Sequence, residues 1–501
     1  MSSSSDDESM ADAMSNQVRV TLKLASSVQD RSLEVPTQAI AVPADIGRKG
    51  LSAVLNHLLG RSVTSDDNES DSDSDDDDSS NASNKLPPLT FEFIVKGTSN
   101  RLLRKGVEKE ARQHGLSLEE AIPITYFPAA NVPEKQTDGE TLPDWISCLE
   151  TAASNQKFVF SGCYDGSIHA YQRTANSGLT KVDFAVARGA GPIKAMAATE
   201  MQDKLWIASA SLDHSLSIHT FETAKKKLHS YGQCVQAENE LGSSSSAYTS
   251  LDFAQTSNLL ASGNGSGKIS IWNVQNVVEN HTKSEKKRQK SSKTKQTTTS
   301  NTPEIAATVH FENSHSQSVT GLSWGNHNNS QNTHLISGSW DHSIKLWDVE
   351  KENCLLTLNG ARVVSCLDTS YHSEGVVATG HPDCTIRLWD VRTNNSKNSV
   401  LISDNKFRPS HKAWVSSVQW SQSNAYQLAS TSHDGTVKVW DIRSSNPLHT
   451  VRTFSKEEKG LSLLWLGSLD DGDDDDDDET NNNKEVIFAG GTDCILKRID
   501  V

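Results

Sequence analysis

The chain has 501 residues, so its length predicts several domains or one large repeat assembly rather than a single ordinary domain. Two acidic runs, at 66–78 and 470–479, hold nine acidic residues each and account for the formal net charge of -16, because the rest of the chain is nearly neutral. The seven cysteines are scattered without a C-x-x-C pair, which argues against a disulfide framework or a zinc site. No apolar stretch approaches the ~20 residues of a membrane span and the N-terminus is polar, so we expect a soluble intracellular protein.

The first 127 residues predict a small α+β domain that follows a disordered N-terminus at 1–16. Apolar residues alternate where strands are expected and recur at helical spacing where helices are expected. The expected elements are strands at 17–25 and 38–42, a helix at 51–59, a strand at 90–95, an apolar step at 102–103, a helix at 107–114 and a strand at 121–127. This order is that of a ubiquitin-like fold over 17–127, with an acidic, disordered insertion at 65–84.

The region 145–501 repeats one pattern seven times: an aspartate or its equivalent in a tight turn, followed by a short strand. The units lie at 161–171, 209–219, 262–272, 337–347, 379–389, 430–440 and 490–499. They resemble WD repeats, and three of them end in a literal Trp-Asp pair, at Trp347, Trp389 and Trp440. The resemblance implies a mostly β fold, a seven-bladed WD-repeat β-propeller, whose uneven spacing reflects a basic insertion at 275–304 and an acidic loop at 470–483.

The WD-repeat resemblance also implies a buried hydrogen-bond tetrad within a blade. The tetrads map onto two units, as His315, Ser339, Asp341 and Trp347 in the fourth and His411, Ser432, Asp434 and Trp440 in the sixth. In two other units His381 and Asn264 stand where the serine is expected. A His, Ser and Asp set also occurs in hydrolases, but its recurrence at the repeat period favours a structural role.

We therefore expect neither enzymatic activity nor a cofactor, because no phosphate-binding glycine loop and no H-E-x-x-H motif is present. The seventh unit ends after its third strand at Val501, and a bare strand edge would leave backbone groups unpaired. The linker at 128–144 is thus predicted to supply the strand that closes the ring.

Stretches of both parts resemble one family. They are GLSAVLNHLLG (50–60), FEFIVKG (91–97), GLSLEEAIPITY (115–126), DWISCL (144–149), SGCYDGSI (161–168) and SHDGTVKVWDIRSSNPLHT (432–450). They look like the NLE-type ubiquitin-like domain and propeller of the WD-repeat subunit of the PeBoW complex. The resemblance implies an assembly factor of the nucleolus and nucleoplasm that binds the block-of-proliferation protein and pescadillo on the large-subunit pre-ribosome. It also implies a requirement for this protein in maturation of the precursor rRNA.

The resemblance assigns a role to Glu119, which with Glu120 follows a helix-stopping glycine. Taken alone, such carboxylates are ordinary solvated surface groups. In the family, a loop glutamate of the ubiquitin-like domain completes the magnesium site of midasin, an AAA-type ATPase, and Glu119 stands at the matching position. Because Mg²⁺ prefers oxygen ligands, a carboxylate from another chain suits an open position of such a site. The resemblance implies that midasin removes the protein through this domain.

The basic insertion has two interpretations beyond that of a solvated loop. Its core, Lys286, Lys287, Arg288 and Lys290, resembles a nuclear-import signal. Direct contact with rRNA phosphates is the alternative, although no aromatic residues accompany the charge.

Two other families remain as alternatives. Substrate receptors of cullin-type ubiquitin ligases carry a W-D-x-R motif, which occurs here at 389–392 and 440–443. The notchless-type assembly factors also join this ubiquitin-like domain to a propeller and bind midasin, but they have eight blades, whereas seven units are found here.

Overall fold

The structure is a computed structural model. It describes residues 17–26, 28, 30–61, 87–96, 101–130, 132–136, 141–174, 178–186, 191–202, 204–235, 246–254, 258–274, 304–311, 314–325, 334–373, 375–392, 400–401, 409–444, 446–467 and 485–501. The chain folds into two compact units, Met1–Asn131 and Val132–Val501, each of which is described by itself. No helix in these ranges has the length and apolar character needed to span a membrane.

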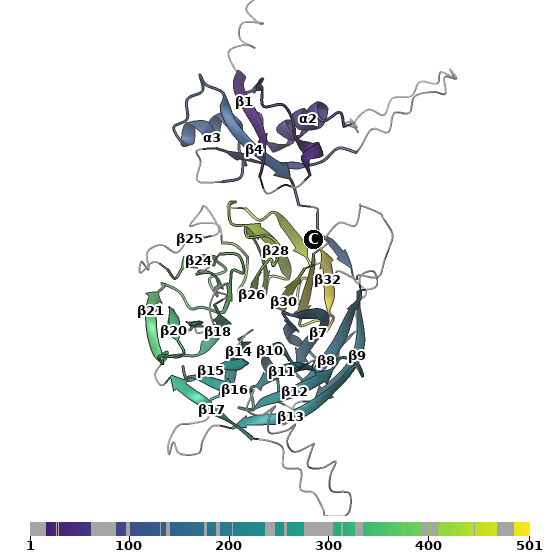
Figure 1. Ribbon diagram of the computed structural model, residues 1–501, viewed down its shortest axis with the longest axis vertical. Coiled ribbons are helices and arrows are strands. Elements are labelled where there is room, and N and C mark those ends of the chain that lie inside the picture. Colours follow the sequence, from purple (N-terminus) through teal and green to yellow (C-terminus); the bar gives the residue numbers. More distant parts are fainter. Residues whose placement is uncertain are drawn as a thin grey trace, which may run out of the picture. The chain divides into compact units, whose positions relative to one another are not determined.

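The first unit is a four-stranded sheet with two α-helices (Figure 1). Its elements are β1 (Gln17–Leu24), η1 (Arg31–Leu33), β2 (Ala39–Pro43), α2 (Arg48–Leu58), β3 (Phe91–Val95), α3 (Val107–Gln113) and β4 (Ile122–Pro128). The strand order is β2-β1-β4-β3, and β1 runs parallel to β4 while the other pairs are antiparallel. The expected order of elements is observed, except that the step at 102–103 makes only an isolated bridge between Leu102 and Ile94.

The core of this unit follows from the alternation of β1, whose apolar residues point to one face. Val20 and Leu22 are completely buried there, together with Leu51 and Leu55 of α2. Val107 of α3 joins the same cluster, so both helices cover one core. The sheet thereby fixes the ends of α3 and β4, between which the candidate glutamate lies.

The second unit contains seven four-stranded antiparallel blades arranged in a ring (Figure 1). Blades 1 to 3 are β6 (Ile146–Ala152), β7 (Asn155–Cys163), β8 (Ser167–Thr174) and β9 (Gly178–Val186); β10 (Ile193–Met201), β11 (Lys204–Ser211), β12 (Leu216–Glu222) and β13 (Lys227–Val235); and β14 (Tyr248–Phe253), β15 (Leu259–Asn264), β16 (Ile269–Asn273) and β17 (Glu304–Phe311). Blades 4 and 5 are β18 (Val319–Trp324), β19 (His334–Ser339), β20 (Ser343–Asp348) and β21 (Asn353–Asn359); and β22 (Cys366–Thr369), β23 (Val376–Gly380), β24 (Ile386–Asp390) and β25 (Val400–Leu401). Blades 6 and 7 are β26 (Val415–Trp420), β27 (Gln427–Ser432), β28 (Thr436–Asp441) and β29 (His449–Arg452); and β30 (Gly460–Leu466), β31 (Val486–Gly491), β32 (Lys497–Asp500) and β5 (Glu134–Gln136).

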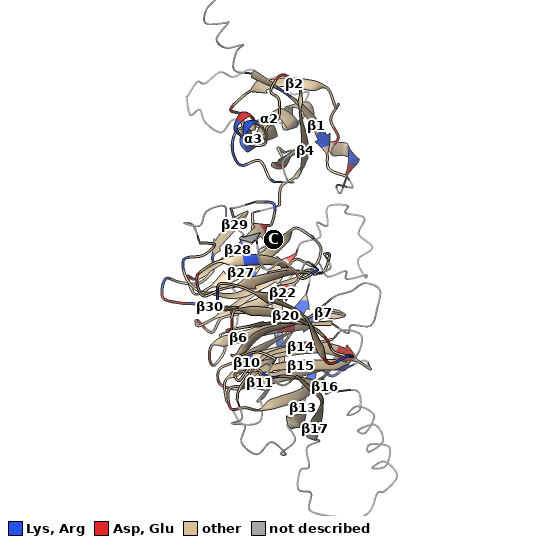
Figure 2. Cartoon of the chain, turned by 90° about the vertical axis from the view of Figure 1, so that its left-hand side faces the viewer, with Lys and Arg blue, Asp and Glu red and all other residues tan. Residues whose placement is uncertain are grey.

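The predicted fold class, a seven-bladed propeller preceded by an α+β domain, is confirmed. The strands of the propeller are mostly uncharged, and charged residues lie mainly in turns and loops (Figure 2). Blades 2 and 3 are further joined into one eight-stranded sheet, because their outer strands β13 and β17 pair in parallel.

The turn between the second and third strands has the same backbone conformation in every blade. The residue after the aspartate position has a positive φ of 61° to 89° in all seven units. These residues are Gly166, His214, Gly267, His342, Cys384, Gly435 and Cys494. The aspartate side chain holds the turn by accepting a hydrogen bond from the N–H two residues later, as Asp341 does from Ser343 at 3.0 Å.

The fourth strand of blade 7 comes from the linker upstream of blade 1. Strand β5 pairs antiparallel with β32 over three residue pairs, Glu134 to Gln136 against Asp500 to Arg498. The linker also makes a bridge between Thr141 and Ile495, and the N–H of Leu142 donates to the carbonyl of Cys494 at 2.7 Å. The edge of β32 is therefore covered by a strand that lies next to the first unit in the sequence.

We predict that disrupting β5 destabilises the propeller. Alternate residues of an edge strand direct their N–H groups to the neighbouring strand, so replacing both Lys135 and Gln136 with proline removes at least one hydrogen bond to β32. Counting a lost hydrogen bond at about 1 kcal/mol, the free energy of unfolding should fall by at least about 1 kcal/mol. Urea unfolding of the full chain measures this, with Val132→Pro, at an exposed linker residue outside β5, as the control. Equal stability of all three chains would contradict the role assigned to β5.

Candidate functional site

The loop that carries Glu119 is anchored on both sides by the core of the first unit. Helix α3 ends in a Schellman motif, in which the N–H of Gly115 donates to Arg112 at 3.2 Å and the N–H of Leu116 donates to Ala111 at 2.9 Å. Gly115 has φ +71°, which a glycine adopts without strain. Leu116 and Leu118 then pack against the core, so the chain direction is fixed before β4 begins.

The carboxylates of this loop face solvent. Glu119 and Glu120 are both exposed, and the backbone N–H of Glu119 donates to the hydroxyl of Ser117 at 3.3 Å. The structure thus presents two solvent-exposed carboxylates on a loop whose leucines, Leu116 and Leu118, pack against the core.

The tetrad of blade 4 contains three of its four predicted residues. His315 Nδ1 lies 2.9 Å from Asp341 Oδ2, and His315 Nε2 lies 2.7 Å from the hydroxyl of Ser337. The indole N–H of Trp347 donates to the same Ser337 hydroxyl at 2.8 Å. The assignment of Ser339 is therefore wrong, because its hydroxyl donates instead to the carbonyl of Gln317 at 3.1 Å.

The reason for this correction is the register of the strands. Ser337 and Ser339 are alternate residues on one face of β19, so the sequence pattern does not separate them. Trp347 pairs directly with Leu335, which places Ser337 within reach of its indole and Ser339 one further step away.

Blade 6 repeats the geometry, and Ser430 rather than Ser432 completes its tetrad. His411 contacts Asp434 at 3.0 Å and Ser430 at 2.7 Å, and Trp440 donates to Ser430 at 2.8 Å. The hydroxyl of Ser432 donates to the carbonyl of Ala413 at 3.0 Å.

The same two-residue correction applies to the divergent blades. Trp389 donates to the hydroxyl of Thr379 at 2.8 Å, and His381 lies 2.8 Å from that hydroxyl, so His381 takes the place of the tetrad histidine rather than of the serine. In blade 3 Trp272 donates to Ser262 at 2.8 Å, whereas Asn264 caps the turn.

The ionisation of the tetrads follows from burial and hydrogen bonding. Burial lowers the pKa of both histidines, His315 and His411, although their aspartates oppose this effect. Burial alone would raise the pKa of Asp341, but hydrogen bonds from Ser343, His315 and the N–H of Ser316 lower it to about 2. The pKa of Asp434 is also lowered, through His411 and Thr436, against the effect of burial. Every polar side-chain group of these two tetrads has a hydrogen-bond partner within its own blade, which is the arrangement expected of a structural network.

A recurring lysine was missed by the sequence analysis. Lys345 and Lys438 each donate to a backbone carbonyl in the loop before the first strand, those of Ser314 and Ser410. Their ammonium groups lie over tryptophans of the same strand, at 5.7 Å and 5.6 Å from the ring centroids. The signal was present as the pattern K-x-W, which places the lysine on the same strand face as the tetrad tryptophan.

Hydroxyl groups of the innermost strands link blades 3 to 7. Each donates to a backbone carbonyl of the next blade: Thr249 to Val319 at 2.6 Å, Thr320 to Val364 at 2.6 Å, Ser365 to Val415 at 2.7 Å and Ser416 to Gly460 at 2.8 Å. Two carboxylates also link neighbouring blades, but as acceptors: Asp252 accepts from the backbone N–H of Trp324 and Asp368 from that of Trp420, both at 2.7 Å.

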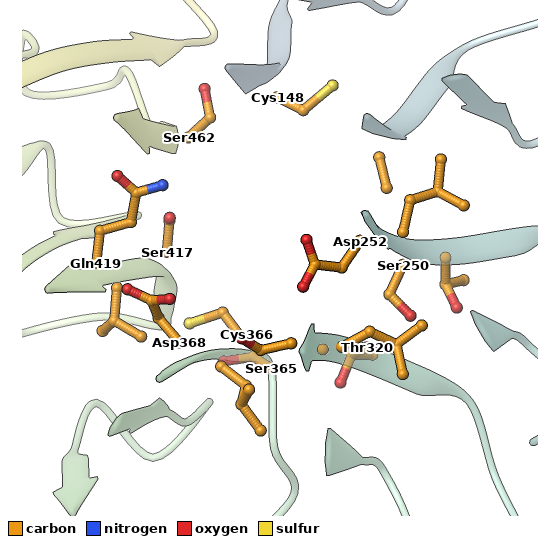
Figure 3. A pocket seen from close by; sticks show the side chains of 18 of the residues that line it. Cys148, Ser250, Asp252, Thr320, Ser365, Cys366, Asp368, Ser417, Gln419 and Ser462 are labelled. Carbon is orange, nitrogen blue, oxygen red and sulfur yellow. The ribbon is translucent and has the colours of Figure 1, made fainter. Parts of the chain in front are cut away.

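These inner strands surround a cavity of about 530 Å³ at the centre of the ring (Figure 3). Glu150, Asp252 and Asp368 line it, from blades 1, 3 and 5. Burial raises the pKa of Asp252 and of Asp368 to about 7, although each accepts backbone N–H groups that oppose the shift. Burial, and then the charges of Asp252 and Asp368, also raise the pKa of Glu150 well above its ordinary value. Among the residues that the structure describes, no group of three His, Cys, Asp or Glu side chains is placed to hold a metal ion.

Two predicted features remain to be placed. The basic core 286–290 and the acidic runs lie outside the described residues. The W-D-x-R arginines are described: Arg392 forms two hydrogen bonds with Asp390, at 2.9 and 2.7 Å, and Arg443 forms two with Asp441, at 2.9 and 2.6 Å. This pairing within each motif gives both arginines a structural role.

Known families match both units. The NLE (NUC135) domain matches residues 20–108. The WD domain, G-beta repeat, matches residues 234–273 and 307–348, and the N-terminal domain of the nucleolar protein 10-like family matches residues 335–458.

Curated relatives match along most of the chain. A ribosome biogenesis protein WDR12 homolog of Oryza sativa subsp. japonica is 30% identical over 86% of this chain and 89% of its own length. A WDR12 homolog of Chlamydomonas reinhardtii is 26% identical over 97% of this chain and 99% of its own length. The ribosome biogenesis protein YTM1 of Scheffersomyces stipitis is 28% identical, covering 90% of this chain and 94% of its own length.

We predict that the two serines of β19 differ in their effect on stability. Ser337→Ala leaves the buried N–H of Trp347 and the ring of His315 without their shared partner, so the free energy of unfolding should fall by about 3 kcal/mol. Ser339→Ala removes weaker bonds at 3.1 and 3.2 Å and should cost about 1 kcal/mol. Urea unfolding of the two variants distinguishes the assignments, since a larger loss for Ser339→Ala would restore the original tetrad.

We also predict an acid dependence that comes from Asp341. Its folded-state pKa of about 2 lies below the ordinary 3.8, so this carboxylate stabilises the fold above about pH 4, and its contribution is lost as the pH falls towards 2. Asp341→Asn should therefore show a smaller fall in unfolding free energy between pH 5 and pH 2.5 than the unchanged chain. An equally steep fall in both proteins would show that Asp341 does not contribute.

Proposed function

This chain belongs to the WDR12/Ytm1-type family of ribosome biogenesis proteins, and from that premise we propose that it is a non-enzymatic scaffold of large-subunit assembly. In this proposal the propeller belongs to a PeBoW complex with the block-of-proliferation protein and pescadillo, and the complex is needed for maturation of the precursor rRNA. Support comes from relatives named as ribosome biogenesis proteins that match 86% or more of the chain. The protein would act in the nucleolus and nucleoplasm, with the basic core 286–290 as its import signal.

In this proposal midasin removes the protein by binding its ubiquitin-like unit. Midasin would bind it through Mg²⁺, with Glu119 as the ligand that completes the metal shell in trans. The observation that carries this step is the exposed carboxylate of Glu119 on a loop fixed by Leu116, Leu118 and the end of α3. The magnesium belongs to midasin, so the residue contributes one oxygen ligand and one negative charge.

The order of the elements along the chain determines which strand a pulling force would reach first. Residues 129–133 connect β4 to β5, so a pull on the ubiquitin-like unit reaches the strand that closes blade 7 before it reaches any other blade. A pulling force applied by midasin would therefore act first on the pairing of β5 with β32, which closes the ring. The cullin-receptor alternative rests on the two W-D-x-R motifs, whereas the relatives that match 86% or more of the chain are named as ribosome biogenesis proteins.

The proposed contact between Glu119 and midasin is tested by measuring binding of the full chain to the metal-site domain of midasin. We expect tight binding in Mg²⁺, loss of binding in EDTA, and at least a 50-fold weaker affinity for Glu119→Ala. Glu119→Gln should bind as weakly, since the amide keeps the size of the side chain but lacks its charge.

Glu120→Ala is the matched control, because Glu120 is the adjacent exposed carboxylate of the same loop. Its affinity should stay within threefold of the unchanged chain. Retained affinity in Glu119→Ala, or a loss confined to Glu120→Ala, would overturn the assignment.

A further inference from the structure

One register position recurs in the innermost strand of every blade, and we call it the inner position. Its partner on the second strand stands one place before the residue that corresponds to Ser337 of blade 4. From blade 1 to blade 7 the inner-position residues are Glu150, Ala197, Asp252, Ser323, Asp368, Gln419 and Leu464. Blades 1, 3 and 5 therefore carry an acid at this position, and the other four blades carry a neutral residue.

Three inner-position side chains accept a backbone N–H from a tryptophan of the next blade. Asp252 and Asp368 do so with carboxyl oxygens, each at 2.7 Å. Gln419 does so with its amide oxygen, which lies 2.6 Å from the backbone nitrogen of Trp465. A neutral oxygen can therefore make this link between blades, so the link does not require that the two aspartates be charged.

The three acids line one cavity, the space of about 530 Å³ inside the ring. Figure 3 shows Asp252, Asp368 and Gln419 around it. The other titratable residues among the described residues of its lining are Cys148, Lys194, Cys366 and Tyr371. Burial raises the pKa of both thiols to about 12 and raises that of the phenol, so these three groups are uncharged near neutral pH. The lysine is exposed, so no buried cation of this lining offsets the charge of the acids.

Ionisation of these acids is unfavourable while the ring is closed. A carboxylate in the cavity lacks the hydration of bulk water, and two further acids face the same space. Burial accordingly raises the pKa of Asp252 and of Asp368 from the ordinary 3.8 to about 7. If the seam beside such a carboxylate opens, water hydrates it and its pKa returns towards the ordinary value. The bound protons therefore stabilise the closed ring fully below about pH 4, and this contribution is lost as the pH rises through about 7.

We propose that Asp252 and Asp368 are proton-binding groups that control how firmly two seams of the propeller close. When protonated, each aspartate links its blade to the next without placing a charge in the cavity. When ionised, each favours opening of its seam, between blades 3 and 4 or between blades 5 and 6. Glu150 adds to this effect from blade 1, because its charge faces the same cavity.

Buried histidines have the opposite pH dependence, so the informative measurement is a difference between two chains. Burial lowers the pKa of His219 and His381 from 6.5 to about 4, and it also lowers that of His315 and His411. Their stabilising contribution is present above about pH 6.5 and is lost as the pH falls. Comparing a variant with the unchanged chain at each pH cancels this contribution.

The test is urea unfolding of the full chain and of Asp252→Asn combined with Asp368→Asn, at pH 5, 6, 7 and 8. Asparagine keeps an oxygen that can accept each N–H, as Gln419 does, but it does not titrate. The unfolding midpoint of the variant minus that of the unchanged chain should rise by about 1 M from pH 5 to pH 8, because only the unchanged chain loses bound protons. A difference that is independent of pH would overturn the proposal.

Glu350→Gln combined with Glu457→Gln is the matched control, because it removes two carboxylates that are exposed on the propeller. The midpoint of this control minus that of the unchanged chain should vary by less than about 0.2 M over the same pH range. A rise as large as that of the asparagine pair would mean that net charge, rather than the inner position, causes the effect, and would overturn the proposal.

Gln419→Glu is the converse variant, and it serves even if the asparagine pair fails to fold. It adds an acid at the inner position of blade 6 and keeps an oxygen for the N–H of Trp465. Its midpoint should equal that of the unchanged chain at pH 5 and fall below it at pH 8. An equal loss at both pH values, or no loss at either, would contradict the proposal.

Hydrogen exchange of the unchanged chain locates the effect without any substitution. After correction for the intrinsic rate at each pH, the amides of 319–324 and 415–420 should exchange at least threefold faster at pH 8 than at pH 6. The amides of 460–466 should not change, because the N–H of Trp465 is held by a neutral amide. An equal change in all three strands would show a general loosening and would overturn the assignment to the two aspartates.

Discussion

The seam between blades 7 and 1 is the constraint on which the propeller depends, because a ring of separate sheets has a fixed shape only when its ends are joined. Blade 7 obtains its fourth strand, β5, from the chain that precedes blade 1, so completing the sheet and closing the ring are one event. The seam itself is apolar, and Leu464 and Leu466 of β30 pack against Leu149 and Val159 of blade 1. Closure therefore combines a short edge pairing with hydrophobic burial.

The other seams are built differently, and this difference shapes the centre of the molecule. From blade 3 to blade 7, hydroxyl and carboxylate side chains of one blade form hydrogen bonds with the backbone of the next blade. In strand β30 of blade 7 the positions of these polar side chains are taken by Leu461 and Leu464. Groups that link blades near the axis must also face the axis. Asp252 and Asp368 are thus held in a confined space beside Glu150, where burial raises the pKa of all three carboxyls.

The two units present carboxylates in opposite settings. In the first unit Glu119 stands in solvent, and the apolar residues beside it fix the loop. In the second unit Glu150, Asp252 and Asp368 line a cavity inside the ring.

Periodicity in the sequence was sufficient for the number of blades and for the order of the main elements in the first unit, because alternation and turn residues are local properties. The WD-repeat resemblance identified the His, Asp and Trp members of the tetrads in blades 4 and 6. It placed the tetrad serines two residues too late, since Ser337 and Ser339 share a strand face and only pairing with β20 decides which one meets Trp347. The links between blades and the acidic cavity arise from residues such as Asp252 and Trp324, 72 positions apart, and only the closed ring brings them together.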